Sequence, residues 1–178
     1  FLGNGKEKGH FKRSLTDFNS SEITKIEVNS PNAGSFTIQK SGADSWNLQV
    51  DGKEYKAEPG SVNSLLSQTS TLKVKQVVAK GESSWEEYYV NDSLGTDSKI
   101  FAGDELKADL VVGRMTFSNT QPRNPYQRQP DAFTFIRPGS ENTVYSTEGM
   151  LSMELNQGAK YFRNTSAFQP DKANLNCI

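Results

Sequence analysis

The chain has 178 residues, a formal net charge of −1, 34% hydrophobic residues, one histidine and one cysteine. A chain of this length forms one domain or two small ones and can bury a real core. The near-neutral charge argues against nucleic acid as a primary partner, because such binding depends on neutralising phosphates. The single cysteine, Cys177, excludes an internal disulfide, and no run approaches the roughly 20 apolar residues of a transmembrane helix.

The first predicted elements are a linker, a strand and a meander. Residues 1–9 are rich in glycine and lysine and are predicted to be a disordered linker. Alternating residues predict a short strand over 23–28, and further alternation over 36–40 and 46–50 predicts two strands with one buried face each. The Asp51-Gly52 pair predicts a tight hairpin into a last strand over 53–57.

The hydrophobic period then becomes that of a helix. Apolar side chains and one threonine recur at spacings of three and four, at Val62, Leu65, Leu66, Thr69 and Leu72. Pro59 suits the first helical turn, where its missing N–H would lack an intrahelical partner. Residues 72–79 are rich in valine and are predicted to be extended again.

The second half of the chain is predicted to contain two hairpins and a helix. Residues 85–90 are dense in aromatic side chains, and Trp85 and Tyr88 are spaced to hold a turn or short helix onto the sheet. Hairpins are predicted around Gly103-Asp104 and around 138–140, followed by a short helix near 150–155. Tyr161-Phe162 is predicted to be a final strand, and 166–178 a tail.

Together these patterns predict an α+β fold of short, mostly antiparallel strands with two amphipathic helices, in a single domain over 10–165. Residues 36–42 resemble 133–139, and each segment precedes a second strand and a helix. Two degenerate β-rich-plus-helix repeats, the half-units 10–80 and 81–165, are therefore an alternative organisation. Hairpin chemistry alone also produces a match of this length.

The sequence offers little material for catalysis. His10 stands in the N-terminal segment and Cys177 in the tail, which excludes histidine-based triads and histidine metal clusters, so we expect no metal and no cofactor. Acidic residues gather locally, at Glu86-Glu87, at Asp92 and Asp97, and at Asp104-Glu105 with Asp109. None stands in a catalytic motif, and a carboxylate-based hydrolase is the third function hypothesis.

The segment 115–131 is the strongest candidate for binding. It is long, polar and contains three prolines, and with its flank it supplies the candidate binding residues Arg114, Phe117, Arg123, Tyr126 and Arg128. Arginine and tyrosine are favoured at binding surfaces, and loops of this length are often functional. We hypothesise that the segment contacts a protein partner or an anionic ligand; a mobile, solvated loop is the structural alternative.

A glycan- or peptide-binding module is the second function hypothesis. It depends on the aromatic residues Trp46, Trp85, Tyr88 and Tyr89 forming an exposed surface. Trp46 stands at an alternating strand position, which favours a place in the core instead.

A series of short motifs stands in a specific order along residues 10–165. The motifs are Phe11-Lys12-Arg13-Ser14-Leu15 with Asp17, Ile23-Thr24-Lys25-Ile26, Phe36-Thr37-Ile38-Gln39-Lys40, Trp46, the helix 62–72, Val77-Val78-Ala79, Tyr88, Leu110-Val111-Val112-Gly113-Arg114 and Thr143-Val144-Tyr145. This order resembles the domain of unknown function 4340 (DUF4340) family. The long 115–131 segment departs from the family pattern, in which this link is shorter.

The resemblance implies an extracytoplasmic bacterial domain of the periplasm or cell surface, anchored by an N-terminal membrane-spanning helix that would precede this sequence. Relatives accompany ABC-type transporter and gliding-motility auxiliary components, and no enzymatic activity defines the family. The first function hypothesis is therefore a non-enzymatic cell-envelope module that binds a protein partner.

Overall fold

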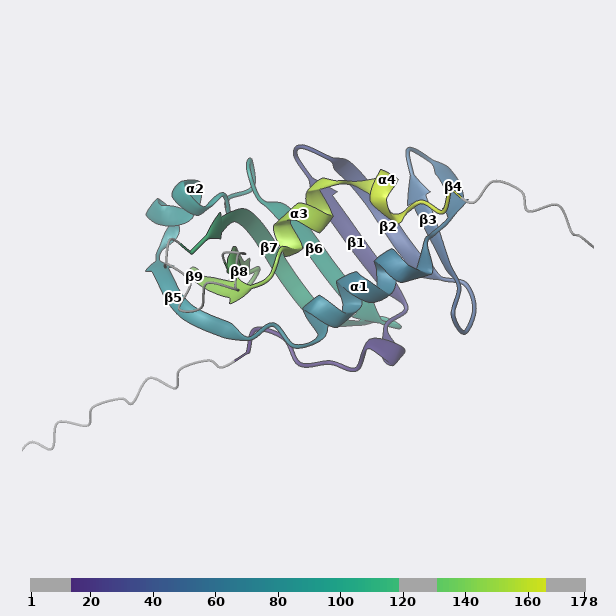
Figure 1. Ribbon diagram of the computed structural model, residues 1–178, viewed down its shortest axis with the longest axis horizontal. Coiled ribbons are helices and arrows are strands. Elements are labelled where there is room, and N and C mark those ends of the chain that lie inside the picture. Colours follow the sequence, from purple (N-terminus) through teal and green to yellow (C-terminus); the bar gives the residue numbers. More distant parts are fainter. Residues whose placement is uncertain (1–13, 119–130, 166–178) are drawn as a thin grey trace, which may run out of the picture.

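The computed structural model describes residues 14–118 and 131–165, and within them nine strands form one sheet (Figure 1). The order across the sheet is β4-β3-β2-β1-β6-β7-β8-β9-β5, and all neighbouring strands are antiparallel. The strands are β1 (Lys25–Ser30), β2 (Gly34–Lys40), β3 (Trp46–Val50), β4 (Lys53–Lys56), β5 (Val74–Lys80), β6 (Thr96–Ala102), β7 (Glu105–Phe117), β8 (Ala132–Pro138) and β9 (Thr143–Glu148).

The helices are short and few. They are α1 (Pro59–Ser70), α2 (Trp85–Tyr88), α3 (Leu151–Asn156) and α4 (Ala159–Phe162), with the 3-10 turns η1 (Ser20–Glu22) and η2 (Glu82–Ser84). Only α1 among the described helices exceeds two turns, so the expected α+β fold with two amphipathic helices is wrong. The structure is dominated by one antiparallel sheet, because strands from both halves of the chain pair with each other.

The expected final strand at Tyr161-Phe162 is also wrong, since these residues end α4. Gly158 has φ +66°, a conformation that favours glycine, and it turns the chain into this helix. The helical turn carries the Phe162 ring into the core, where its centroid lies 5.4 Å from that of Phe36.

The sheet joins two meanders through their first strands. Strands β1 to β4 form one meander and β6 to β9 the other, and Lys25–Asn29 of β1 pairs with Asp97–Phe101 of β6. The similar segments 36–42 and 133–139 fall on β2 and β8, the second strand of one meander and the third of the other. Their similarity therefore does not mark equivalent strands of the two meanders.

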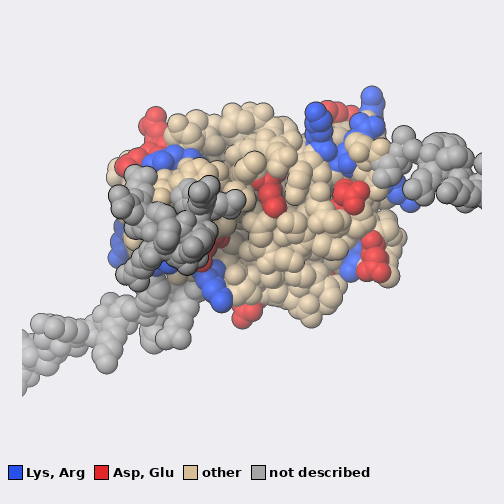
Figure 2. Space-filling model, in the orientation of Figure 1, with Lys and Arg blue, Asp and Glu red and all other residues tan. Residues whose placement is uncertain are grey.

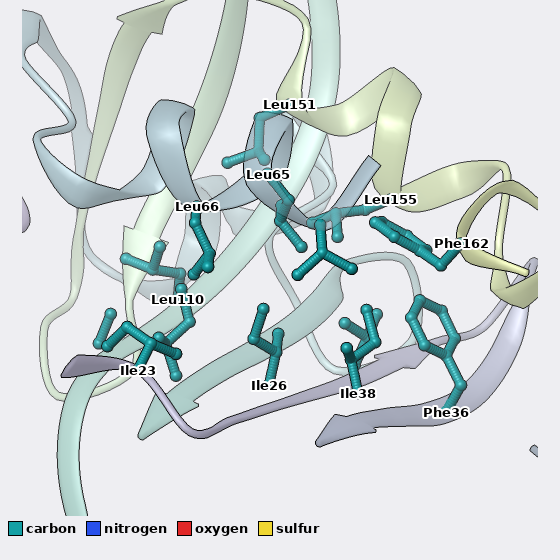
Figure 3. Packing of buried hydrophobic residues seen from close by; sticks show 14 of the residues in the cluster. Ile23, Ile26, Phe36, Ile38, Leu65, Leu66, Leu110, Leu151, Leu155 and Phe162 are labelled. Atoms are coloured by element: carbon teal, nitrogen blue, oxygen red, sulfur yellow. The ribbon is translucent and has the colours of Figure 1, made fainter. Parts of the chain in front are cut away.

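The main core lies between one face of the sheet and the helices α1, α3 and α4. Val62, Leu65, Leu66 and Thr69 of α1 are buried, as their spacing predicted. Leucines of α1 and α3 point toward isoleucines of the sheet in Figure 3, which labels Leu65, Leu66, Leu151, Leu155, Ile26 and Ile38. The strand alternation predicted from sequence supplies the facing side chains, including Trp46, which is 4% exposed.

A second, smaller cluster lies on the opposite face of the sheet. It contains Val90, Val111, Phe135 and Val144, with Trp85 and Tyr88 packed against it. Val111 stands between Leu110 and Val112, which belong to the main core, so its side chain lies on the opposite face of β7. The segment that carries α2 covers this cluster, and the rest of that face is formed largely of polar side chains.

Candidate functional site

The structure places two of the five candidate binding residues. Arg114 and Phe117 lie on β7. Arg123, Tyr126 and Arg128 lie outside the described residues, as does most of the 115–131 segment.

Arg114 is partly engaged within the chain. Its Nε donates a hydrogen bond of 2.9 Å to the carbonyl oxygen of Glu87, at α2. Its guanidinium lies 5.0 Å from the ring centroid of Phe135 and 5.8 Å from that of Tyr88. Arg114 therefore holds α2 against the sheet, a structural role that its sequence context does not indicate.

Arg137, which the sequence analysis did not single out, has a similar role on β8. It is 5% exposed, its Nε donates to the carbonyl oxygen of Val90 at 3.0 Å, and its guanidinium lies 3.8 Å from the ring centroid of Trp85. These contacts remove much of Trp85 from the surface that a stacked sugar would need.

Three acidic residues from two parts of the sequence, Asp92, Asp97 and Asp109, come near one another and near Arg137. Burial raises the pKa of Asp97, the charges of Asp92 and Asp109 raise it further, and Lys99 and Arg137 oppose the shift. The antiparallel pairing of β6 with β7 causes this approach, since Asp97 pairs with Val111. Within the described residues, however, no group of three or more histidine, cysteine, aspartate or glutamate side chains is arranged to hold a metal ion.

Phe117 lies at the end of β7 and lines a groove. The groove has a volume of about 600 Å³ and lies between α1, α3 and the ends of β7, β8 and β9. Its described lining residues are Gln68, Phe117, Asp131, Ala132, Glu148, Gly149, Met150 and Glu154. We call it the acidic groove, because three of these residues are carboxylates and none is lysine or arginine.

Hydrogen bonds hold two of the three carboxylates. Lys75 forms an ion pair of 2.8 Å with Glu148, and the hydrogen bond to Glu148 is the main cause of the raised pKa of Lys75. Glu154 Oε1 accepts hydrogen bonds from Gln68 Nε2 at 2.6 Å and from Ser64 Oγ at 3.1 Å. Glu154 Oε2 is buried and has no hydrogen-bond partner among the described residues.

Two half-exposed apolar side chains line the groove with these acids, and a third follows along α3. Phe117 is 50% exposed, Met150 48% and Met153 53%. Met150 lines the groove with Phe117, and Met153 follows one helical turn later, its N–H donating to the carbonyl oxygen of Met150. We call Phe117, Met150 and Met153 the methionine surface. Sequence reasoning used both methionines only as helix positions. The sequence did contain a signal for their exposure: apolar residues of 150–155 lie on more than one side of the helix, so some of them face outward.

The polar face of the sheet carries two smaller grooves. One, of about 430 Å³, is lined by Ser35, Thr37, Gln49 and Glu54 among others. The other, of about 330 Å³, is lined by Ser35, Thr37 and Asp97 of β6 among others. Ser35 and Thr37 line both, so the two grooves are adjacent. The aromatic residues of the glycan hypothesis do not line them.

Comparison with known proteins places the chain in a family. A family model described as "Domain of unknown function (DUF4340)" matches residues 46–178. The chain belongs to the DUF4340 family. The match begins at β3 and includes the elements that form the acidic groove, whereas the DUF4340-like motifs before residue 46 lie outside it. No match was found among curated proteins or among solved structures. In the described part of this DUF4340 chain, no helix is long and apolar enough to cross a membrane.

Proposed function

We propose that this DUF4340 chain is a non-enzymatic protein-interaction module of the cell envelope, and that its partner binds at the methionine surface. The observation that carries the proposal is the exposure of Phe117, Met150 and Met153, each about half exposed. Phe117 and Met150 line the acidic groove, and Met153 follows Met150 one helical turn later. Large apolar side chains gathered on a surface mark sites where another molecule binds. The polar rim around them fits the anatomy of a protein interface.

The partner is a component of an ABC-type transporter or of a gliding-motility assembly. This part of the proposal extends the family resemblance, because relatives accompany such components. An extracytoplasmic domain held by an N-terminal membrane-spanning helix would present the methionine surface to them.

Site-specific photo-crosslinking tests the proposal. A photo-reactive amino acid replaces Met153 or Phe117 in the full-length protein in its own cells, and crosslinked products are identified by mass spectrometry. The matched control position is Asn32, an exposed residue in the turn between β1 and β2. We expect a defined envelope protein to be captured from both test positions and not from Asn32. Equal capture from all three positions, or none from Met153 and Phe117, would refute the proposal.

A glycan- or peptide-binding module is the second candidate, and the adjacent polar grooves favour it. They offer hydroxyl, amide and carboxylate groups from neighbouring strands, which suit a polar ligand. The same crosslinker at Lys99, an exposed residue that lines one of these grooves, separates the candidates. Capture from Lys99 alone would favour the second.

A further inference from the structure

We infer that the acidic groove binds a basic, apolar segment of the partner protein, a stretch in which lysine or arginine stands among aliphatic or aromatic residues. The inference rests on the proposed function and names the chemistry of the partner.

The charge of the groove sets the sign of its ligand. Asp131, Glu148 and Glu154 line it, with no lysine or arginine among its described lining residues. Lys75 pairs with Glu148 from outside this lining. On the face shown in Figure 2, acidic groups show in the middle, over α1 and α3, whereas lysine and arginine lie toward the two ends together with further acidic groups. A cationic segment is therefore attracted to this part of the surface and an acidic one is repelled.

Glu154 gives the groove a specific acceptor. Ser64 and Gln68 fix its Oε1 by donating hydrogen bonds, so the carboxylate has a defined orientation. The other oxygen, Oε2, is buried without a hydrogen-bond partner among the described residues. A lysine or arginine that enters the groove would supply the opposite charge to this fixed carboxylate.

The methionine surface determines the rest of the ligand. Methionine side chains are unbranched and polarizable, and they adapt to apolar side chains of different shapes. Phe117 adds an aromatic side chain from the end of β7. A volume of about 600 Å³ accommodates several side chains, so a peptide segment that carries both apolar and cationic groups fits better than a single ion.

The chain itself contains a segment of similar composition. Residues 1–13 carry Lys6, Lys8, Lys12 and Arg13 against Glu7, together with Phe1, Leu2 and Phe11. The experiment must therefore distinguish a partner segment from this one.

Peptide display on the whole protein tests the inference. Random peptides of about 12 residues, which reach roughly 40 Å when extended, are selected on the wild-type protein, and the best binder is measured by fluorescence anisotropy. We expect the selected peptides to combine lysine or arginine with apolar residues. Glu154→Gln keeps an oxygen for Ser64 and Gln68 but removes the charge, and we expect it to weaken binding about tenfold. Glu27→Gln is the matched control, because Glu27 lies on the opposite face of the sheet.

Methyl NMR of methionine locates the site. The chain has three methionines, Met115, Met150 and Met153, so the labelled protein gives three signals that single substitutions assign. We expect the selected peptide to shift the Met150 and Met153 signals in the wild type and in Glu27→Gln.

Three outcomes would overturn the inference. If the selection yields neutral or acidic peptides, or if Glu154→Gln binds the peptide with unchanged affinity, charge does not determine binding in the groove. Crosslinks from Met153 would still support the proposed function. Unmoved Met150 and Met153 signals would exclude the groove as the peptide site. A variant with Lys8, Lys12 and Arg13 changed to glutamine tests whether the chain's own N-terminal segment fills the groove. If the Met150 and Met153 signals of this variant move without peptide and it binds peptide more tightly, residues 1–13 are the occupant.

Discussion

The contacts of Arg137 predict that its replacement by lysine strongly destabilises the protein. The guanidinium makes two interactions in a buried place, the hydrogen bond from Nε to the carbonyl oxygen of Val90 at 3.0 Å and the stacking on Trp85 at 3.8 Å. Lysine keeps the positive charge but lacks the planar group that makes both interactions at once. The ammonium group of lysine would then stand without these contacts at a position that is only 5% exposed in the wild type.

The magnitude follows from these two terms. A hydrogen bond that involves a charged group contributes about 1.5–3 kcal/mol. A desolvated cation–π contact contributes about 2 kcal/mol. Since the two are not additive, we expect Arg137→Lys to lower the free energy of unfolding by about 3 kcal/mol. With a urea dependence of about 2 kcal/mol per molar, the unfolding midpoint falls by about 1.5 M.

Urea unfolding followed by tryptophan fluorescence and circular dichroism measures the loss. The matched control is Arg163→Lys, because the Arg163 guanidinium lies 3.9 Å from the ring centroid of Tyr55 but its side chain is exposed. An exposed contact of this kind contributes only about 0.5 kcal/mol. Equal losses in the two variants, or a loss below about 1 kcal/mol in Arg137→Lys, would refute the argument that burial makes this contact strong.

Two further predictions concern a glycine and a tyrosine. Gly113→Ala places a Cβ against the carbonyl oxygen of Tyr88, so we expect a loss of about 2–3 kcal/mol in thermal or urea unfolding; Gly60→Ala in α1, whose Cβ would meet only Glu58 Oε1 at 3.7 Å, should be neutral or stabilising. Burial, and then the hydrogen bond to Glu141, raises the pKa of Tyr145 from 10.0 to about 12. The folded state favours the protonated phenol, so this contribution is complete below pH 10 and is lost as the pH rises toward 12. Unfolding free energies measured across this range should fall less steeply in Tyr145→Phe, and parallel profiles would contradict the assignment.

Local periodicity predicted much of the secondary structure but not how the strands pair. The alternation over 36–40 and 46–50 and the helical spacing from Val62 to Thr69 correctly marked the side that is buried, because a single face of each element meets the core. The pairing of β1 with β6, and of β5 with β9, joins segments far apart in the chain, and no period within either segment specifies its partner. For this reason the sequence predicted α+β where the chain forms one sheet.

The acidic groove could not be predicted for the same reason. Its lining comes from α1, β7, β8, β9 and α3, so Gln68, Phe117, Glu148 and Glu154 meet only after β7, β8 and β9 have paired. Of the candidate residues chosen from sequence, Phe117 is a groove residue and Arg114 a structural one, although they are three residues apart on the same strand. Strand geometry explains the difference, since side chains at odd separations along a strand point to opposite faces.

This geometry links the stability of one face to the function of the other. Strand β7 holds α2 through Arg114 on one face and ends three residues later in Phe117, at the acidic groove. Clusters of buried side chains pack against both faces of β7, through Leu110 and Val112 on one side and Val111 on the other. Phe117 lies beyond these clusters and is half exposed, so its ring lines the groove from the end of a strand that is anchored in the core. We therefore expect a partner to meet an aromatic side chain of a core strand and the adaptable methionines of the α3 segment, with the carboxylates of the groove selecting its charge.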